Sequence, residues 1–448
     1  MNGLERVVRF IQQCHWEALP SPVQQRVKMA LLDDLGATLA GTLTRVSRIV
    51  TDWALETLPG NEATIFLHDE RVSAIGAAFA NGYAANALDI DGCARYTRGH
   101  PGAQIFPTAL ALAEKLRADG PQMMSAMVVG YEVALRTARC WHDHHTTYQA
   151  CGSWGSVACA AVAANLLGLS EEQIENALGI AEYHAPNLPM MRDIDTPTMV
   201  KHGTGWGTVT GIIAAQLAAS GFTAIPCLLG LDRYKEWVAD IGQRYIMVNG
   251  IAWKQYACCA WTHPSLDAAR SLMHRHNIPA QEIAHIRVET FHEAHRLGTE
   301  LPTTTEEAQF SLAWPLAVLL LDNEVGPRQI LEERLGDEQI RDLAKKVELV
   351  ESEEFNQLYR LVSVGDPRGK YVSAVTITLK DGQQFASGTM EGGVRFPQGW
   401  NEEQVERKFR WLTGFVLDQA HVDKLVEMVW HFEDVSHADE LSGLVAHY

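Results

Sequence analysis

Residues 87–103 read Ala-Leu-Asp-Ile-Asp-Gly-Cys-Ala-Arg-Tyr-Thr-Arg-Gly-His-Pro-Gly-Ala. This polar stretch follows an alanine-rich run, Ala74–Ala87, and precedes a second apolar run, Phe106–Ala113. Both runs have the composition of buried helices. Ionised side chains are costly beside a core unless they pair or take part in chemistry. Because rigid helices on both sides hold a polar loop in place, the stretch predicts a functional loop within a helical domain.

The loop supplies the first candidate catalytic side chains, Asp89, Asp91 and His100. Carboxylates close to an imidazole are suited to acid–base chemistry, and such groups gather at clefts. The alternative is that the aspartates only cap the following helix, and we favour the catalytic interpretation. Arg95 and Arg98 in the same loop are candidates for binding a carboxylate.

The first half of the chain predicts one large helical domain. Ser21-Pro22 opens a helix that continues with helical apolar spacing over Val23–Ala40. Ser170-Glu-Glu-Gln173 is a capping-box pattern that opens another. Helices that are apolar on most faces are buried by other helices. Three such runs are Val128–Arg139, Gly155–Leu167 and Gly207–Ser220.

The pattern changes after Trp253. Ile283–Thr290 alternates as a strand does, and Val347–Val350 is a second candidate strand. Tyr371–Leu379 and Gln384–Thr389 flank an Asp-Gly turn and predict a hairpin. Helical segments lie between these strands, as in an α+β domain.

We therefore expect a mainly α fold with an α+β second domain, and 448 residues are enough for both. The large all-helical domain is expected over residues 1–259, completed by residues 395–448. The smaller α+β lid domain is expected over residues 260–394.

Charge and composition exclude several classes of function. The net charge of −18 argues against a nucleic-acid partner, whose phosphates favour clustered Lys and Arg. It does not exclude an anionic small substrate, because a few cations in a pocket outweigh distant surface charge. No apolar run reaches about 18 residues, so we expect no membrane-spanning helix.

Cysteine usage indicates the compartment. The eight cysteines include no CxxC pair, and the chain start lacks a signal-peptide core. We therefore expect a reducing, cytoplasmic setting and no metal site.

Two further segments carry candidate site residues. Lys201 lies in a glycine-rich turn before an apolar helix, which suits either a carboxylate clamp or simple tight packing. His263 lies at the proposed domain boundary, where it has either a role in a cleft or a capping hydrogen bond. His142-Asp-His-His145 is more consistent with a solvated loop than with a metal site.

The chain resembles the MmgE/PrpD family, which includes 2-methylcitrate dehydratase, cis-aconitate decarboxylase and iminodisuccinate epimerase. The resemblance covers nearly the whole chain. It is carried, in order, by Ala87–Asp91, His100–Ala103, Gly155–Leu169, Lys201, Gly221–Thr223, Thr262–Ala268 and Ala308–Ser311.

The resemblance implies a helical main domain, an α+β lid and an active site in the cleft between them. It also implies a homodimer, no metal or organic cofactor, and a substrate with two or three carboxylates. By matching position, Asp89 and Asp91 correspond to the family's acidic pair and His100 to its HP histidine. Lys201 corresponds to its site lysine and His263 to its lid-hinge histidine.

Several positions depart from the family pattern. Gly92 and Cys93 stand where another aspartate and a threonine are usual, and Gln149 replaces a histidine, for which His145 is a nearby substitute. His202 directly follows Lys201. Trp206 stands where an arginine is common, and Trp314 where a tyrosine is usual. We assign Cys93, Gln149 and His202, with Arg95 and Arg98, to substrate binding.

The family reactions share a carbanion-like or enolate-like state next to a carboxylate. In our hypothesis His100 or His263 moves the proton, Lys201 and the arginines hold carboxylates, and Asp89 and Asp91 orient a histidine or water. We expect a cofactor-independent lyase, a dehydratase or decarboxylase, that acts on a small di- or tricarboxylate. The alternatives are an epimerase or racemase of a substituted succinate, and a non-catalytic dimeric binding protein.

Overall fold

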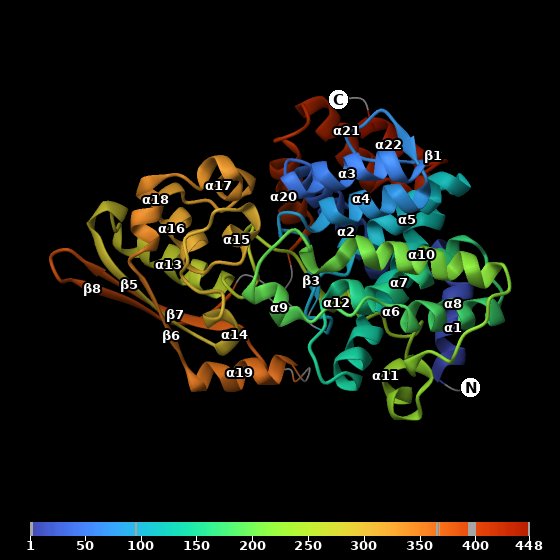
Figure 1. The fold of residues 1–448 in the computed structure, drawn as a ribbon, viewed down its shortest axis with the longest axis horizontal. Helices are drawn as coiled ribbons and strands as arrows, with labels where there is room; N and C mark the ends of the chain where they lie inside the picture. Colours follow the sequence, from blue (N-terminus) through green and yellow to red (C-terminus); the bar gives the residue numbers. More distant parts are fainter. Residues whose placement is uncertain (1–2, 95, 364–365, 367, 393–399, 447–448) are drawn as a thin grey trace.

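The computed structural model describes residues 3–94, 96–363, 366, 368–392 and 400–446. Figure 1 shows two lobes side by side, a large helical one and a smaller one that holds a β-sheet. The fold is therefore mainly α with an α+β portion in the C-terminal half, which confirms the predicted class.

The large lobe consists of helices packed on helices. α7 (Cys151–Leu166) packs against α6 (Gly120–His144) and α10 (Thr204–Ala219), and α4 (Ala74–Asn86) packs against α5 (Gly102–Leu116). Small side chains allow these close approaches. The other helices of this lobe are α1 (Gly3–Gln13), α2 (Ser21–Gly41), α3 (Arg45–Thr57), α8 (Glu171–Tyr183), α11 (Lys235–Val238) and α12 (Met247–Gly250), and α9 (Met190–Asp195) lies between the lobes in Figure 1.

The smaller lobe is built around a four-stranded sheet in the order β6-β5-β7-β8. The strands are β5 (Ile283–Thr290), β6 (Val347–Glu351), β7 (Val372–Leu379) and β8 (Gln384–Glu391). β5 pairs with β6 in parallel, and the other pairs are antiparallel. Its helices are α13 (His263–His276), which packs against β7 and β8, and α14 (His292–His295), α15 (Thr305–Gln309), α16 (Ala313–Asp322), α17 (Pro327–Ile330), α18 (Glu338–Ala344) and α19 (Glu353–Ser363).

The C-terminal helices return to the large lobe. α20 (Glu402–Thr413) and α21 (Gln419–Trp430) pack against α2, and α22 (Asp439–Ala446) packs against α21 and α5, in the part of the lobe that holds α2 and α3 in Figure 1. The large lobe thus contains both ends of the described chain.

Short strand pairs fix the loops of the large lobe. β1 (Pro59–Thr64) pairs with β2 (Arg71–Val72), and β3 (Cys93–Ala94) pairs antiparallel with β4 (Ile251–Ala252). These two pairs are not in the sequence-based prediction. β2, β3 and β4 have two residues each and give no periodic signal, and the six residues of β1 do not alternate between buried and exposed positions.

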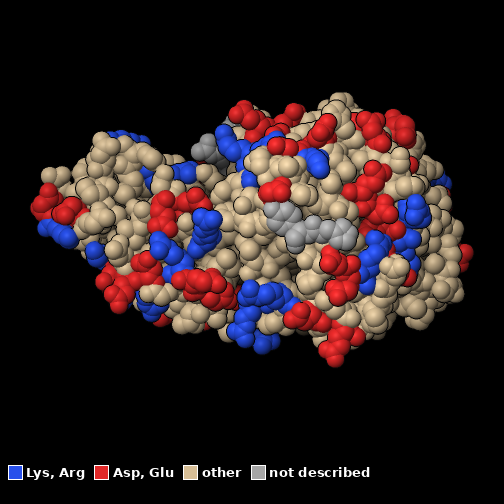
Figure 2. All heavy atoms as spheres, turned by 90° about the horizontal axis from the view of Figure 1, so that it is seen from above, with Lys and Arg blue, Asp and Glu red and all other residues tan. Residues whose placement is uncertain are grey.

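Figure 2 shows acidic and basic side chains interspersed over the face it presents, with a narrowing between the lobes. That face carries no continuous basic patch of the kind that binds nucleic acid. Among the described helices, none combines the length and apolarity needed to cross a membrane.

Candidate active site

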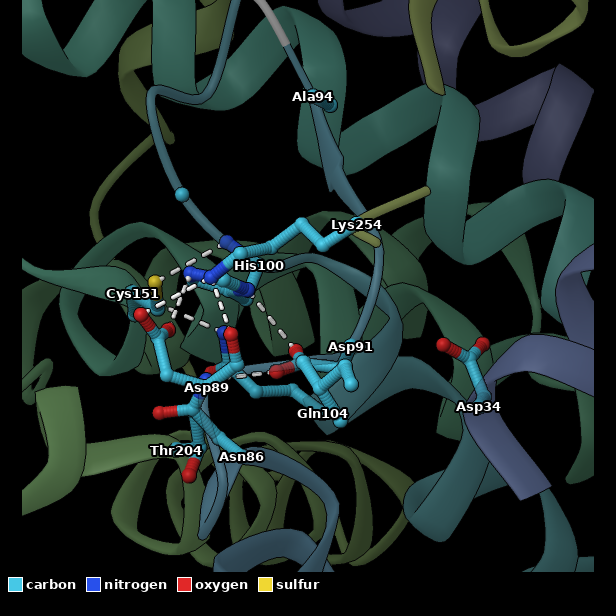
Figure 3. Close-up of polar contacts among 12 residues, drawn as sticks. Asp34, Asn86, Asp89, Asp91, Ala94, His100, Gln104, Cys151, Thr204 and Lys254 are labelled. Carbon is cyan, nitrogen blue, oxygen red and sulfur yellow. Dashed lines mark hydrogen bonds and ion pairs between the residues drawn. The ribbon is translucent and has the colours of Figure 1, made fainter. Parts of the chain in front are cut away.

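The acidic loop, residues 87–101, connects α4 to α5 at the junction of the lobes. Its apolar residues Leu88 and Ile90 are buried in the same core as side chains of the smaller lobe. Asp89 and Asp91, which alternate with these apolar residues, both approach His100 (Figure 3). Asp89 has a left-handed backbone, with φ 49°, which bends the chain at this point. The alternation of apolar and acidic residues therefore anchors the loop and presents two carboxylates.

His100 lies between these carboxylates. Its Nε2 is 3.1 Å from Asp89 Oδ1, and its Nδ1 is 3.0 Å from Asp91 Oδ2. Burial opposes the charged imidazolium, but the negative charges of Asp91 and Asp89 outweigh burial and raise the pKa of His100 to about 9. His100 is therefore a cation near neutral pH, and it is equipped to donate a proton.

Lys254 completes this arrangement from a distant part of the chain. Its Nζ is 2.9 Å from Asp89 Oδ2, and it also donates to the Asp89 carbonyl. The pairing of β3 with β4 brings it there, since Lys254 follows β4 by two residues. Burial opposes ionisation of Asp89, but Lys254 and His100 hold the pKa of Asp89 well below its usual value.

Lys201 is buried and links the two lobes. Its Nζ donates to Gln309 Oε1 at 2.6 Å, and Gln309 Nε2 donates to the Ala87 carbonyl at 2.9 Å. The ammonium also lies over the Phe310 ring, 5.1 Å from its centroid. Lys201 and His202 both have left-handed backbones, with φ 42° and 57°, in the turn that precedes α10.

A second histidine lies beside His100. The rings of His100 and His202 are nearly parallel, with centroids 5.8 Å apart. His202 Nδ1 is 2.6 Å from Asp193 Oδ2, and this carboxylate also accepts the His202 backbone N–H. Burial opposes the ionised Asp193, but His202 outweighs it and lowers the pKa of Asp193. Two imidazoles, each held by carboxylate, thus face one region.

Both lobes line the cavity next to His100, whose volume is about 40 Å³. The large lobe contributes Asp89, Cys93, Arg98, His100, Tyr148 and His202, and the smaller lobe contributes Cys259, Trp261, Phe310 and Tyr371. A second cavity of about 560 Å³ shares His202 and includes Asp193, Arg192 and Trp206. The smaller cavity holds the acid–base groups, so we regard it as the chemical centre and the larger one as adjoining space.

Residues 5–232 match the MmgE/PrpD N-terminal domain, and residues 256–434 match the MmgE/PrpD C-terminal domain. The chain belongs to the MmgE/PrpD family. Cis-aconitate decarboxylase of Homo sapiens is 29% identical over 457 residues, which cover 95% of this chain and 91% of that protein. The Aspergillus terreus protein of that name is 26% identical over 468 residues, 93% of this chain and 91% of its own length. The Mus musculus protein is 26% identical over 458 residues, covering 95% and 90%.

The other expected site residues of this MmgE/PrpD chain take varied positions. Cys93 and Arg98 line the cavity, and the Arg98 guanidinium stacks on the Tyr148 ring, 4.0 Å from its centroid. Burial raises the pKa of the Cys93 thiol to about 12, so Cys93 is not a thiolate nucleophile. Arg95 lies outside the described residues.

Gln149 and His263 are not among the described residues that line this cavity. Gln149 instead holds a loop, with Nε2 donating to Asn187 and Oε1 accepting from Leu188 N–H at 2.7 Å. His263 is fully buried at the start of α13. Burial and Lys254 lower the pKa of His263 to about 3, so it is neutral.

The histidine cluster near residue 145 lies at a helix end. The prediction that residues 142–145 form a loop is wrong for the first three, because α6 continues through His144. His142 faces inward and contacts the Thr97 carbonyl at 2.9 Å. His145 is exposed, its ring lies against Trp141, and it does not appear among the described cavity-lining residues.

Sequence reasoning missed three residues of the site. Lys254 lies nine residues before His263, and Gln309 lies in the family motif Ala308–Ser311. Both segments were noted in the sequence, but neither residue was given a role in the site. Asp193 had only its position beside two methionines. Lys254 and Gln309 each contact a site residue that lies more than 100 positions away in the sequence, so the sequence alone does not show these contacts.

The arrangement does not favour a metal ion. Ligand atoms of Asp89, His100 and His202 lie within 4.8 Å of one another, the one such group of three found in the described part of the chain. However, both His100 nitrogens already face carboxylates, and Lys254 occupies the second oxygen of Asp89. A dication would have to displace a buried ammonium, so the geometry is better suited to proton transfer.

Proposed function

We propose that this protein is a cofactor-independent lyase that acts on a small tricarboxylate of the cis-aconitate type. The observation that carries the proposal is His100, a protonated imidazole held between Asp89 and Asp91 at a cavity shared by both lobes. The family membership and the names of the relatives support the same class of reaction.

Decarboxylation needs an electron sink and a proton donor. When the bond to one carboxylate breaks, CO₂ leaves and its electron pair remains on the carbon skeleton. In an unsaturated tricarboxylate this pair delocalises through the double bond towards a remaining carboxylate, and a proton then adds to carbon. His100 supplies that proton once one of its N–H groups turns from its carboxylate partner to the substrate, and the ammonium groups of Lys254 and Lys201 stabilise the developing negative charge.

Substrate carboxylates bind to the cations that line the junction. Arg98 lines the cavity, and its stacking on Tyr148 leaves the guanidinium edge for a bidentate contact. Lys201, whose ammonium already faces a neutral amide oxygen, exchanges this partner for a carboxylate. A cavity of about 40 Å³ is too small for a tricarboxylate, so the lobes open to admit substrate and close around it.

The test is the release of CO₂ from cis-aconitate by the wild type, by His100→Gln and by His145→Gln. His145 is exposed and serves as the matched histidine control. We expect a loss of about 10²–10⁴-fold in His100→Gln, the usual contribution of a positioned acid, and no loss in the control. Undiminished turnover in His100→Gln would exclude His100 as the proton donor.

A second candidate function is epimerisation of a substituted succinate. The observation that favours it is the His202–Asp193 pair beside His100, since one imidazole that removes a proton and one that returns it are what epimerisation requires. Chiral chromatography after incubation in D₂O distinguishes the reactions, because inversion with deuterium uptake and no CO₂ release identifies an epimerase. Ligand binding with neither product identifies a binding protein.

We also propose that the protein is a homodimer. α10 exposes Trp206, Ile213 and Leu217 along one side, and Phe222 and Ile225 beyond its end are exposed as well. An apolar surface of this kind marks a contact with another protein. Sedimentation velocity tests this: we expect a dimer in the wild type and a monomer in Ile213→Glu. A monomeric wild type would exclude the proposal.

A further inference from the structure

A cavity lined by Gln255, the residue after Lys254, has no part in the mechanism above. Its volume is about 350 Å³, and it lies between α13 of the smaller lobe and α20 of the large lobe. Three of its lining side chains are cationic, Arg270, Arg407 and Lys408. Three others are aromatic, Tyr256, Trp400 and Trp411.

The cations are arranged to meet an anion. Arg407 is exposed, and no ion pair joins it to another residue that the structure describes. Arg270 lies over the Tyr256 ring at 5.3 Å while one nitrogen contacts Asp267. Glu324 is the acidic lining residue, and it is exposed and accepts from Trp411 Nε1. Three cations thus line the wall beside one acid, and two of them, Arg270 and Lys408, also pair with Asp267 and Asp33.

The aromatic rings suit a flat molecule. Trp400 and Trp411 are partly buried, and Tyr256 is almost fully buried. The Lys408 ammonium lies 5.7 Å from the Trp400 ring centroid. Aromatic faces next to guanidinium and ammonium groups bind a planar group through stacking and its charge through ion pairs.

The wall of this cavity is continuous with the acidic loop. Lys408 is almost fully buried, its Nζ donates to the Ile90 carbonyl at 2.7 Å, and it pairs with Asp33. Ile90 stands between Asp89 and Asp91. Gln255, which also lines the cavity, directly follows Lys254. Lys408 therefore connects the wall of this cavity directly to the loop that holds His100.

We propose that this cavity is a second binding site, for a small organic anion with a planar ring or conjugated group, and that its occupancy acts on the acidic loop through Lys408. The ligand's charge pairs with Arg407 and Lys408, and its flat part lies against Trp400 and Trp411. A negative group near Lys408 competes with Asp33 and Ile90 for the ammonium. Binding at this site does not require that the reaction proposed for the His100 cavity is correct.

Binding is measured by titration calorimetry with 1-naphthalenesulfonate, and with methanesulfonate as the same anion without a ring. We expect Arg407→Ala to weaken naphthalenesulfonate binding by about 2- to 5-fold, the effect of losing one exposed ion pair. Lys424→Ala removes one exposed cation from the neighbouring helix α21, and we expect no change there. His100→Gln is expected to bind the probe normally.

The coupling is measured by hydrogen–deuterium exchange with the probe bound. We expect slower exchange both in α20 and in residues 87–94 of the acidic loop. No binding, equal affinity in Arg407→Ala, or an equal loss in Lys424→Ala would overturn the second site. Binding that leaves exchange over residues 87–94 unchanged would overturn the link to the loop.

Discussion

His100 owes its charge to its neighbours. Asp91 makes the largest contribution that raises its pKa, ahead of Asp89, and together they outweigh burial. An acid with a pKa of about 9 stays protonated through neutral pH and loses its proton as the pH rises further. A reaction that needs this acid therefore slows above about pH 9.

We predict that Asp91→Asn moves this alkaline limit to lower pH. Removing one negative charge lowers the pKa of His100 towards its ordinary value of about 6.5, so the proton is lost earlier as pH rises. We expect kcat/KM at pH 8 to fall about 10-fold or more, with partial recovery at pH 6. The measurement is the pH–rate profile of each variant.

Asp143→Asn is the control for this profile, since Asp143 is exposed and pairs with Arg233 on the surface. Its profile should match that of the wild type. An unshifted alkaline limit in Asp91→Asn would contradict the assignment of His100 as the acid.

We predict that Lys254→Met destabilises the fold. The change removes one of the two cations that pair with the buried Asp89, and breaking a buried ion pair costs about 3–5 kcal/mol. Because the pKa of Asp89 is depressed in the folded protein, the ionised carboxylate stabilises the fold at pH values above its ordinary pKa. This stabilisation is lost as the pH falls. Without Lys254 the pKa of Asp89 is less depressed and this stabilisation is smaller. The free energy of unfolding of the variant should therefore fall less steeply towards acid pH than that of the wild type.

Urea unfolding between pH 7 and pH 4 measures both effects. Lys235→Met is the control, because Lys235 forms an exposed pair with Asp232. A variant as stable as the wild type would show that the Lys254–Asp89 pair contributes little to stability, and Lys254→Arg should retain most of it.

At the residue scale, the sequence was sufficient for the acidic loop and insufficient for its partners. Asp89, Asp91 and His100 fall within 12 residues, so their convergence is a local property. Lys254 joins them only through β3–β4 pairing, and Gln309 only through contact between lobes. His263 was predicted to be catalytic because it is a histidine at the proposed domain boundary. In the fold it is buried and neutral, and it is not among the described residues that line the cavity.

Elements with a repeating pattern were predictable. β5 matches its predicted range over Ile283–Thr290, and α2 spans Ser21–Gly41 around the predicted Val23–Ala40. The parallel pairing of β5 with β6 had no signal, because the sequence separates these strands by several helices. Periodicity reports which face a strand buries, while register and partner depend on the whole fold.

At the scale of elements, the junction of α5 with α2 positions His100, and we predict that Gly102→Ala disturbs it. A Cβ at Gly102 would lie 2.0 Å from Asp34 Oδ1 and 2.5 Å from the Tyr131 hydroxyl, both fully buried. We expect a loss of about 1–3 kcal/mol in the free energy of unfolding, the usual cost of overpacking. Because α5 begins two residues after His100, activity should fall as well.

Chemical denaturation compares this variant with Gly443→Ala. Gly443 lies in α22 with open space around its Cβ position, so alanine there should be neutral or stabilise the helix by up to about 1 kcal/mol. Equal stability of the two variants would indicate that α5 moves freely relative to α2.

The whole molecule works as two lobes joined at the site. The two apolar cores meet near the acidic loop, and Lys201, Gln309 and the Ala87 carbonyl form a chain of hydrogen bonds across the junction. In the reaction proposed above the lobes separate to admit substrate, and in that case these bonds break and re-form in each cycle. Gln309 is therefore placed to couple closure of the lobes to the position of Lys201.

We predict that Gln309→Ala loosens this junction without changing any charge. It leaves the Lys201 ammonium and the Ala87 carbonyl without their amide partner, at a cost of about 1–3 kcal/mol per buried group. Amide hydrogen exchange over residues 87–94 should accelerate, and kcat/KM should fall. Gln329→Ala is the matched control, because among the described residues the Gln329 side chain bonds within the smaller lobe, to Gly326 and Asp322. If both variants leave exchange at the acidic loop unchanged, closure does not depend on this link, and apolar packing alone must hold the lobes together.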